Sequence, residues 1–339
     1  MSRKHFMAKP FTDMGKRAYN ETHMKQIYLA PLEGITDNTY RNKFFEFYGG
    51  CKKAFTPFLS PNSTMKFTTR EFREIDPEIN DTAITVPQLL TNKAEWFLWA
   101  AREIASFGYE EVNLNLGCPS GTVVAKKKGS GLLFYPDLLD EMLDEIFSDL
   151  PSTAAGKPLN VSVKTRLGKM DPDEFYEILD VFNKYPILEL TLHPRIQTDF
   201  YKEPIRKEYF SYATSHAKIP LVFNGEIKSV DDIVDTENEF PSISAVMLGR
   251  GLIANPELAI AYKNGRELSA PDLERLKAFH NELLAAYTEL FSGDKPVLHR
   301  MKELWVFWRE LFPNCEKNVK QIQKSKHLSE YKAAVQGIM

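Results

Sequence analysis

Short apolar runs and longer amphipathic stretches alternate along most of the chain. Short runs bounded by polar or turn-forming residues are typical of buried strands, and the amphipathic stretches are long enough to form helices. The runs that we interpret as strands are Ile27–Ala30, Lys53–Thr56, Ala83–Gln88, Glu111–Asn115, Asn160–Thr165, Ile187–Leu192, Leu221–Asn224 and Ala245–Leu248. The clearest helices between them are Asn38–Phe47, Ala94–Phe107, Pro136–Leu150 and Pro172–Phe182. Eight strands with interleaved helices predict an α/β fold, a parallel TIM (β/α)8 barrel.

The pattern changes near the C-terminus, where the strand signals stop. From about Pro271 the pattern is entirely helical, with stretches at Asp272–Phe291, Pro296–Phe312 and Lys317–Ala334. Gly265 and Pro271 interrupt the periodicity, so we place a domain boundary at Asn264–Ala270. The 339 residues suit a barrel of about 250 residues and a smaller domain. We therefore predict an N-terminal extension over residues 1–25, a barrel over residues 26–264 and an all-helical C-terminal domain over residues 271–339.

The composition is that of a globular protein, with 43% hydrophobic and 26% charged residues. No apolar run approaches the roughly 20 residues that span a bilayer, and the N-terminus lacks the apolar core of a signal peptide. We therefore expect a cytoplasmic protein without membrane contact. We also expect a monomer, although no feature of the sequence determines the oligomeric state. Cys51, Cys118 and Cys315 are odd in number and widely spaced, which fits neither a disulfide framework nor a zinc site. We therefore expect no metal.

Polar residues and glycines gather where the predicted strands end. In a TIM barrel the active site lies at these C-terminal ends, and stability requires no such residues there. The residues at this rim are Pro31, Leu32, Glu33, Gln88, Asn115, Lys164, Arg166, His193, Arg195, Asn224, Gly225, Glu226, Gly249 and Arg250. Their recurrence at nearly every strand end predicts a functional site on one rim of the barrel.

The rim carries the parts of a phosphate site and of an acid or nucleophile. Gly225 and Gly249 follow the last two strands, which is the usual phosphate position in this fold. Arg250 can add a charge-assisted hydrogen bond to the same phosphate. Cys118 follows a buried strand and precedes three lysines, so it can act as a nucleophile or as a proton donor.

The remaining polar side chains of the rim suit an aromatic heterocycle. Gln88, Asn115 and Asn224 are amides, which both donate and accept hydrogen bonds along the polar edge of such a ring. Lys164 could lie near the N1–C2 region of a flavin and stabilise the reduced, anionic ring. His193 shares the rim with Lys164, which favours a functional over a structural histidine.

Eight sequence segments together carry a family resemblance. They are APLEGITDNTYR (residues 30–41), VPQLL (86–90), VNLNLGCPS (112–120), GSGLL (129–133), VSVKTRLG (161–168), LTLHPR (190–195), FNGEI (223–227) and VMLGRGLIANP (246–256). In this order they resemble the tRNA-dihydrouridine synthases, and the ordered set is far more specific than any one segment. Asn113 stands where that family often has an acidic residue, and Leu32 where a methionine is common.

The resemblance implies a particular reaction. It implies a bound FMN, NADPH as the reductant, and reduction of the C5–C6 bond of a uridine in tRNA. Hydride would pass from the flavin to C6, and Cys118 would donate a proton to C5. The flavin contacts that the resemblance implies are Pro31, Leu32, Glu33, Gln88, Lys164, His193, Asn224, Gly225, Glu226, Gly249 and Arg250. To these we add Asn115 as an amide of the same rim.

The whole chain has a net charge of -3 and a pI of about 6.2. If it binds tRNA, which is a polyanion, it needs a local basic surface for that contact. Three consecutive lysines follow Cys118, and the C-terminal domain is rich in cations. The residues that we expect to contact tRNA are Lys126, Lys127, Lys128, Arg166, Arg195, Arg300 and Arg309. We expect the C-terminal domain to hold the tRNA while the barrel performs the redox step.

Two other functions are open at this point. A flavin-dependent barrel enzyme that reduces a small molecule, such as a dihydropyrimidine or an enone, would have a similar cofactor site. The helical tail with its basic residues argues for a macromolecular substrate instead. The second alternative is an RNA-binding scaffold on a barrel without chemistry, and the complete set of rim residues argues against it.

Overall fold

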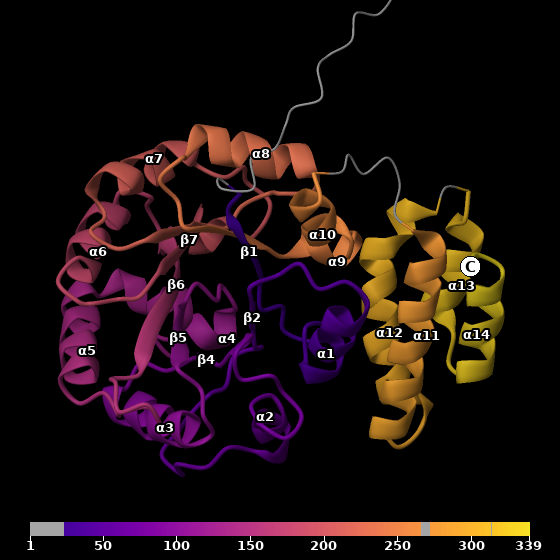
Figure 1. The fold of residues 1–339 in the computed structure, drawn as a ribbon, viewed down its shortest axis with the longest axis horizontal. Coiled ribbons are helices and arrows are strands. Elements are labelled where there is room, and N and C mark those ends of the chain that lie inside the picture. The colour runs from indigo at the N-terminus through magenta and orange to yellow at the C-terminus, as the bar shows by residue number, and fades with distance from the viewer. Residues whose placement is uncertain (1–23, 266–271, 313) are drawn as a thin grey trace, which may run out of the picture.

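A ring of parallel strands forms the centre of the molecule (Figure 1). The computed structural model describes residues 24–265, 272–312 and 314–339. The strands are β1 Gln26–Leu29, β2 Lys53–Phe55, β3 Thr85–Val86, β4 Gln88–Leu89, β5 Glu111–Leu116, β6 Asn160–Gly168, β7 Leu190–Ile196, β8 Leu221–Phe223 and β9 Ala245–Leu248. Their order in the sheet is β3-β2-β1-β9-β8-β7-β6-β5-β4, and every pair is parallel. The predicted TIM barrel is confirmed.

Pro87 separates β3 from β4, which are the two ends of the sheet order. The sequence predicts one strand over Ala83–Gln88, but the structure divides it, because proline has no N–H to donate to a neighbouring strand. The carbonyl of Pro87 still accepts a hydrogen bond from the N–H of Asn113 at 2.8 Å. The eight predicted strands are therefore nine strands in the structure.

Two strands run farther than their hydrophobic patterns indicate. β6 extends to Gly168 and β7 extends to Ile196, and the two pair along this length with one irregularity. β7 also begins at Leu190 rather than at Ile187. Hydrophobic periodicity marks the apolar part of a strand, so the polar residues at these ends conceal the extension.

The longer helices of this part surround the ring on its outer side, whereas the short α4 lies over the middle of the ring in this view (Figure 1). The helical elements are α1 Asn38–Phe47, α2 Thr69–Arg73, α3 Ala94–Ser106, α4 Gly121–Val124, η2 Gly129–Phe134, α5 Pro136–Ser148, α6 Glu174–Phe182, η3 Gln197–Asp199, α7 Lys207–His216, α8 Val230–Glu239, α9 Arg250–Ala254 and α10 Leu258–Lys263. The longer helices bury apolar side chains against the strands, and Phe97, Leu143 and Phe210 are fully buried in this way. Among the described residues, no helix has both the length and the apolar character to cross a membrane.

A bundle of helices follows the barrel and packs at its side (Figure 1). Its elements are α11 Leu273–Leu290, α12 Asp294–Trp308, η4 Arg309–Leu311, α13 Glu316–Lys324 and α14 Leu328–Gln336. The prediction of one helix over Lys317–Ala334 is wrong, because the structure has two helices that separate at Ser325. The carbonyl of Ser325 accepts a hydrogen bond from Lys302, and the carboxylate of Glu330 accepts one from the N–H of Lys326 at 2.7 Å. These contacts satisfy backbone groups that a continuous helix would otherwise pair.

Two predicted features lie largely outside the described residues. The predicted N-terminal extension covers residues 1–25, of which only residues 24 and 25 are described. The boundary predicted at Asn264–Ala270 includes residues 266–270, which are also outside the described part of the chain.

The barrel and the C-terminal helices share one hydrophobic core. Phe279 on α11 is fully buried, and its ring centroid lies 5.6 Å from that of Tyr40 and 5.3 Å from that of Tyr48. Trp308 of α12 donates its Nε1–H to the carbonyl oxygen of Ile253 at 2.9 Å. The C-terminal helices therefore bury aromatic surface that the barrel alone would expose.

The change Phe279→Ala is expected to lower the free energy of unfolding by about 3–5 kcal/mol, because it leaves a cavity among buried aromatic rings. The measurement is equilibrium unfolding in urea. Val306→Ala on α12 is the control, since Val306 is 49% exposed and its truncation should change the free energy by less than about 0.5 kcal/mol. Equal effects of the two changes would contradict a core shared by both parts.

Candidate active site

A pocket opens at the C-terminal ends of the strands, where the sequence places the site. Its lining residues are Ala30, Pro31, Leu32, Gly117, Lys164, Arg166, His193, Tyr201, Asn224, Gly225, Gly249 and Arg250. They belong to, or follow, β1, β5, β6, β7, β8 and β9. The parallel ring brings these strand ends to one rim, so most of the predicted cofactor residues meet in one pocket.

Four predicted cofactor residues are not part of this lining. Gln88 and Asn115 are buried, and Asn115 Nδ2 donates to Gln88 Oε1 at 2.7 Å. Glu33 and Glu226 each form an ion pair with an arginine of the chain. A direct contact between these four side chains and a cofactor stays a prediction.

Two glycines allow the loops of the rim to pack closely. A Cβ at Gly251 would lie 2.0 Å from the carbonyl oxygen of Ile227, and a Cβ at Gly225 would lie 2.6 Å from the ring of Phe223. Any other residue would therefore displace the loops that follow β8 and β9. These loops carry Arg250 to the pocket wall, at the position that the sequence pattern assigns to a phosphate.

Lys164 contributes a half-buried amine to the pocket. Burial, together with the nearby guanidinium of Arg166, lowers the pKa of Lys164 to about 7. Within the described part of the chain, its Nζ has no hydrogen-bond or ion-pair partner. A ligand acceptor beside this amine would restore its charge, which fits the electron-rich N1–C2 edge of a flavin.

His193 contributes a neutral imidazole. Burial and the charges of Arg166 and Lys164 hold the pKa of His193 well below its usual range. Its Nδ1 lies 2.8 Å from the carbonyl oxygen of Asn224, and its Nε2 lies 3.3 Å from Nη1 of Arg195. A carbonyl can only accept, so the Nδ1–H donates to Asn224 and Nε2 accepts from the guanidinium. The protein thus holds this ring in one tautomer.

The protein holds the loop of Cys118 from two sides. The N–H of Cys118 donates to Asn115 Oδ1 at 2.9 Å, and its carbonyl accepts from Ser130 Oγ at 2.8 Å. Gly129 has a φ of +56°, and a Cβ there would lie 2.9 Å from the Cys118 carbonyl oxygen. Burial raises the pKa of the Cys118 thiol. The thiol therefore stays protonated at neutral pH, which favours a proton donor over a thiolate nucleophile.

Sequence reasoning missed two residues of the site. Ser130 lies in the GSGLL segment, which contributes to the family resemblance without an assigned role for its serine. Tyr201 lines the pocket, and its ring centroid lies 4.6 Å from the guanidinium carbon of Arg250 and 5.3 Å from that of Arg166. In the sequence, Tyr201 is marked only by its position shortly after a strand of the site. Its contacts with the two arginines could not be predicted, because contacts between a cation and a ring depend on the tertiary structure.

Two of the residues predicted to contact tRNA are engaged within the protein. Arg166 is 2% exposed and donates to three backbone carbonyl oxygens. Arg195 is 0% exposed, donates to the carbonyl oxygen of Glu203 and pairs with Glu226. Both side chains are buried at the ends of β6 and β7 and are engaged within the protein. They shape the site, and a contact of either side chain with tRNA stays a prediction.

Arg300, a further residue predicted to contact tRNA, also has partners within the protein. It donates to the carbonyl oxygen of Gly34, and its Nε lies 3.5 Å from Asp37 Oδ2. Its side chain, which is 17% exposed, therefore ties α12 to the loop that follows β1. Arg309, by contrast, is exposed and available to a ligand.

The three consecutive lysines follow α4 beside the loop of Cys118. Lys126 and Lys127 are exposed, and Lys128 is half-buried. The Nζ of Lys127 lies 4.2 Å from the ring centroid of Tyr135, and that of Lys128 lies 5.4 Å from the ring of Trp96. Their proximity to the pocket keeps the predicted tRNA contact in place as a proposal.

The fold and the pocket define a TIM-barrel enzyme with its site at the C-terminal ends of the strands. The old yellow enzyme from Trypanosoma cruzi matches with a TM-score of 0.50 and 10% identity, over 74% of this chain and 91% of that chain. A variant of NCR from Zymomonas mobilis matches with a TM-score of 0.50 and 12% identity, over 74% and 90% respectively. At these identities the likeness shows the fold alone.

The sequence comparisons then show the family. The model of the family Dihydrouridine synthase (Dus) matches residues 28–337, so this chain belongs to that family of flavin-dependent oxidoreductases. The tRNA-dihydrouridine(16) synthase of Vibrio vulnificus is 28% identical over 301 residues, which cover 86% of this chain and 90% of the relative. The protein of the same name from Pseudomonas putida is 31% identical over 251 residues, which cover 71% and 75%. The resemblance inferred from the eight segments is confirmed.

Flavin affinity is expected to depend on pH through Lys164. In the flavin-free protein its pKa is about 7, and an acceptor on the flavin would raise that pKa, so binding takes up a proton above about pH 7. Affinity should be highest below this pH. It should fall by up to about tenfold per pH unit until the pH passes the higher pKa of the bound state.

The measurement is calorimetric titration of flavin-free protein at several pH values, in buffers of different ionisation enthalpy. Lys164→Met should bind more weakly and abolish the proton uptake, because methionine keeps a similar length but has no titratable group. An equal pH dependence in both proteins would place the flavin away from Lys164.

Proposed function

We propose that this chain reduces the C5–C6 bond of a uridine in tRNA, with FMN as the bound flavin and NADPH as the reductant. The observation that carries the proposal is the rim that brings Lys164, His193 and Arg250 into one pocket, next to the loop of Cys118. Relatives named tRNA-dihydrouridine(16) synthase match most of the chain. Their name supports the uridine at position 16 as the target.

The residues of the pocket support FMN in particular. Gly225, Gly249 and Arg250 suit one phosphate group at the usual position after the last two strands. Lys164 would face the N1–C2 edge of the ring and neutralise the charge of its reduced form. FMN, when bound and reduced by NADPH, supplies the hydride that adds to C6 of the uracil ring.

Cys118 would complete the reduction. Hydride addition at C6 moves an electron pair to C5, and the Cys118 S–H donates the proton that C5 requires, after which the thiolate regains a proton from solvent. Burial raises the pKa of this thiol, which keeps the proton in place in neutral solution. Asn115 and Ser130 hold the loop, so the proton donor is positioned before the substrate arrives.

The tRNA would lie across the C-terminal helices and the three lysines. Exposed cations of these helices include Arg309, Lys317, Lys320, Lys324 and Lys326. A row of such cations can follow an RNA backbone, although the chain is acidic as a whole. The proposal therefore assigns the redox step to the barrel, residues 26–264, and tRNA binding to residues 271–339, in a cytoplasmic monomer.

The test is dihydrouridine formation by the wild type and by Cys118→Ala. We expect the purified protein to release FMN on denaturation and to convert position 16 of a tRNA transcript with NADPH. Cys118→Ala should keep its flavin and the reduction of that flavin by NADPH. Its dihydrouridine formation should fall by about 10²–10⁴-fold, because the general acid is missing. The measurements are mass spectrometry of the tRNA and flavin absorbance, with Cys315→Ala as a control outside the barrel.

Each part of the proposal has its own contrary result. Near-normal tRNA reduction by Cys118→Ala would remove Cys118 from the mechanism, and release of FAD would contradict FMN. Modification elsewhere in tRNA would contradict position 16 alone. Turnover of free uridine or enones without tRNA would favour the small-molecule reductase, and a colourless protein that binds tRNA would favour the scaffold.

Affinity for tRNA is expected to fall steeply with salt, because lysines that contact phosphates release counterions. Replacement of Lys126, Lys127 and Lys128 together by glutamine should weaken binding. It should also flatten the logarithmic salt slope by roughly one unit for each phosphate that a lysine no longer neutralises. The measurement is tRNA binding by fluorescence anisotropy over a series of salt concentrations.

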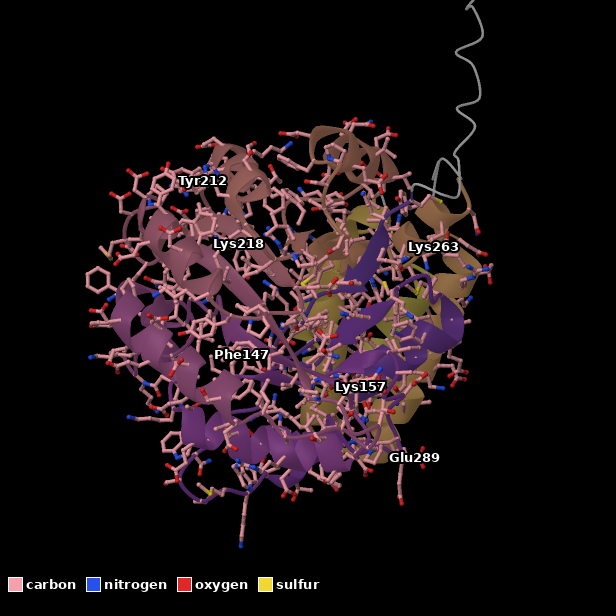
Figure 2. All side chains as sticks on the ribbon, turned by 60° about the vertical axis from the view of Figure 1, so that its left-hand side comes forward. Phe147, Lys157, Tyr212, Lys218, Lys263 and Glu289 are labelled. Atoms are coloured by element: carbon pink, nitrogen blue, oxygen red, sulfur yellow. The ribbon has the colours of Figure 1, made fainter. Side chains whose placement is uncertain are left out.

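A triple variant at the opposite end of the barrel is the matched control. Lys52, Lys157 and Lys218 are exposed, and they precede β2, β6 and β8 at the N-terminal ends of the strands (Figure 2 labels the last two). Their replacement by glutamine changes the net charge equally and should leave the salt slope nearly unchanged. The same slope in both triple variants would place the RNA surface elsewhere.

A further inference from the structure

A continuous chain of hydrogen bonds begins at the N-terminal end of the barrel interior. Ser162 Oγ donates to Glu111 Oε1 at 2.6 Å. Asn113 Nδ2 donates to Ser162 Oγ at 2.9 Å, and Gln88 Nε2 donates to Asn113 Oδ1 at 2.8 Å. These side chains come from β4, β5 and β6, so the chain crosses three neighbouring strands.

The chain of hydrogen bonds ends on the backbone of the Cys118 loop. Asn115 Nδ2 donates to Gln88 Oε1 at 2.7 Å. Asn115 Oδ1 accepts from the N–H of Gly117 at 3.0 Å and from the N–H of Cys118 at 2.9 Å. Every donor therefore points the same way, from the loop toward the N-terminal end of the barrel.

The two ends of this series of hydrogen bonds, the carboxylate of Glu111 and the N–H groups of the Cys118 loop, each have a fixed hydrogen-bonding role. Lys53 Nζ lies 2.7 Å from Glu111 Oε2 and 2.7 Å from a carboxylate oxygen of Glu189. Burial raises the pKa of Glu111, and contacts with Lys53 and Ser162 oppose that rise. The ammonium favours the ionised carboxylate, which can only accept, and the N–H groups of the Cys118 loop can only donate.

The three amides between the ends have two orientations each when considered alone. Within the chain, one orientation of each amide satisfies both neighbours, because a reversal would place two N–H groups or two oxygens face to face. Gln88 and Asn113 are 0% exposed and Asn115 is 7% exposed, so solvent cannot satisfy a reversed amide. The carboxylate of Glu111 at one end and the N–H groups of the loop at the other thus favour the same orientation of Asn115.

We propose that Ser162 and Asn113 are positioning residues, which fix the amide orientations and thereby hold Cys118 where it can donate its proton. Neither residue is part of the pocket lining. Without the hydroxyl of Ser162, Asn113 Nδ2 loses its acceptor, and the three amides keep their orientation from the loop end alone. Asn115 would then release the loop for part of the time. The assignment of Cys118 as proton donor rests on the proposed function.

The test compares Ser162→Ala with Ser244→Ala. Ser244 is a matched control, because its Oγ lies 3.3 Å from Glu189 Oε1, the other carboxylate that contacts Lys53. Its hydroxyl takes no part in the series of hydrogen bonds that leads to Cys118. The first readout is the rate at which iodoacetamide alkylates Cys118 in the flavin-loaded protein, followed by peptide mass spectrometry across pH. The second is the pair of kinetic constants for tRNA reduction.

Ser162→Ala should raise the alkylation rate of Cys118 by about tenfold, because a released loop exposes the thiol and its pKa falls toward the ordinary value. The same change should lower kcat by up to about 100-fold and leave KM for tRNA nearly unchanged. Ser162→Thr keeps the hydroxyl and should restore both quantities. Ser244→Ala should alter neither.

Equal alkylation rates and equal kcat values in Ser162→Ala and Ser244→Ala would overturn the proposal. If Ser162→Ala does not fold, Asn113→Leu decides the matter with the same readouts, since leucine has a similar shape and removes both the donor to Ser162 and the acceptor for Gln88. Failure of the proposed function is a separate result. Full tRNA reduction by Cys118→Ala would remove the catalytic role of Cys118, while the alkylation rates would still show whether the chain holds its loop.

Discussion

The pairing of β1 with β9 joins the first strand of the barrel to the last, and the rest of the site depends on it. The two strands pair in register from Gln26–Ala245 to Leu29–Leu248. Because all the strands are parallel, this closure brings Pro31, Lys164 and Arg250 to one rim, although they lie far apart in sequence. An open sheet of the same strands would separate these residues, so the pocket is a consequence of closure.

The burial of ionisable side chains that have no neutralising partner then determines the chemistry of the rim. The guanidinium of Arg166 is held by backbone carbonyl groups, so it stays beside its neighbours as a fixed positive charge. This charge and burial together lower the pKa values of Lys164 and His193. Burial raises the pKa of Cys118. The site therefore holds an amine, an imidazole and a thiol that are ready to respond to an electron-rich ligand.

The C-terminal helices combine a structural role with the proposed RNA-binding role. Phe279 and Trp308 belong to the core shared with the barrel, and Arg300 ties α12 to the loop after β1. Removal of these helices would expose that core, so a shortened chain would not separate the two roles. Charge changes at exposed positions such as Arg309 separate them, because they leave the shared core intact.

The sequence by itself determined the barrel and most of its rim, because strand periodicity and strand order suffice to predict where parallel strands end. Lys164, His193 and Gly225 were found in this way. Only the tertiary structure decided which cations are buried, since that depends on neighbours distant in the chain. Arg166 and Arg300 resemble surface cations in the sequence, yet carbonyl groups from other elements bind both. Hydrophobic periodicity carries no information on such polar contacts, and the directed hydrogen bonds that reach Cys118 follow from the packing of three strands alone.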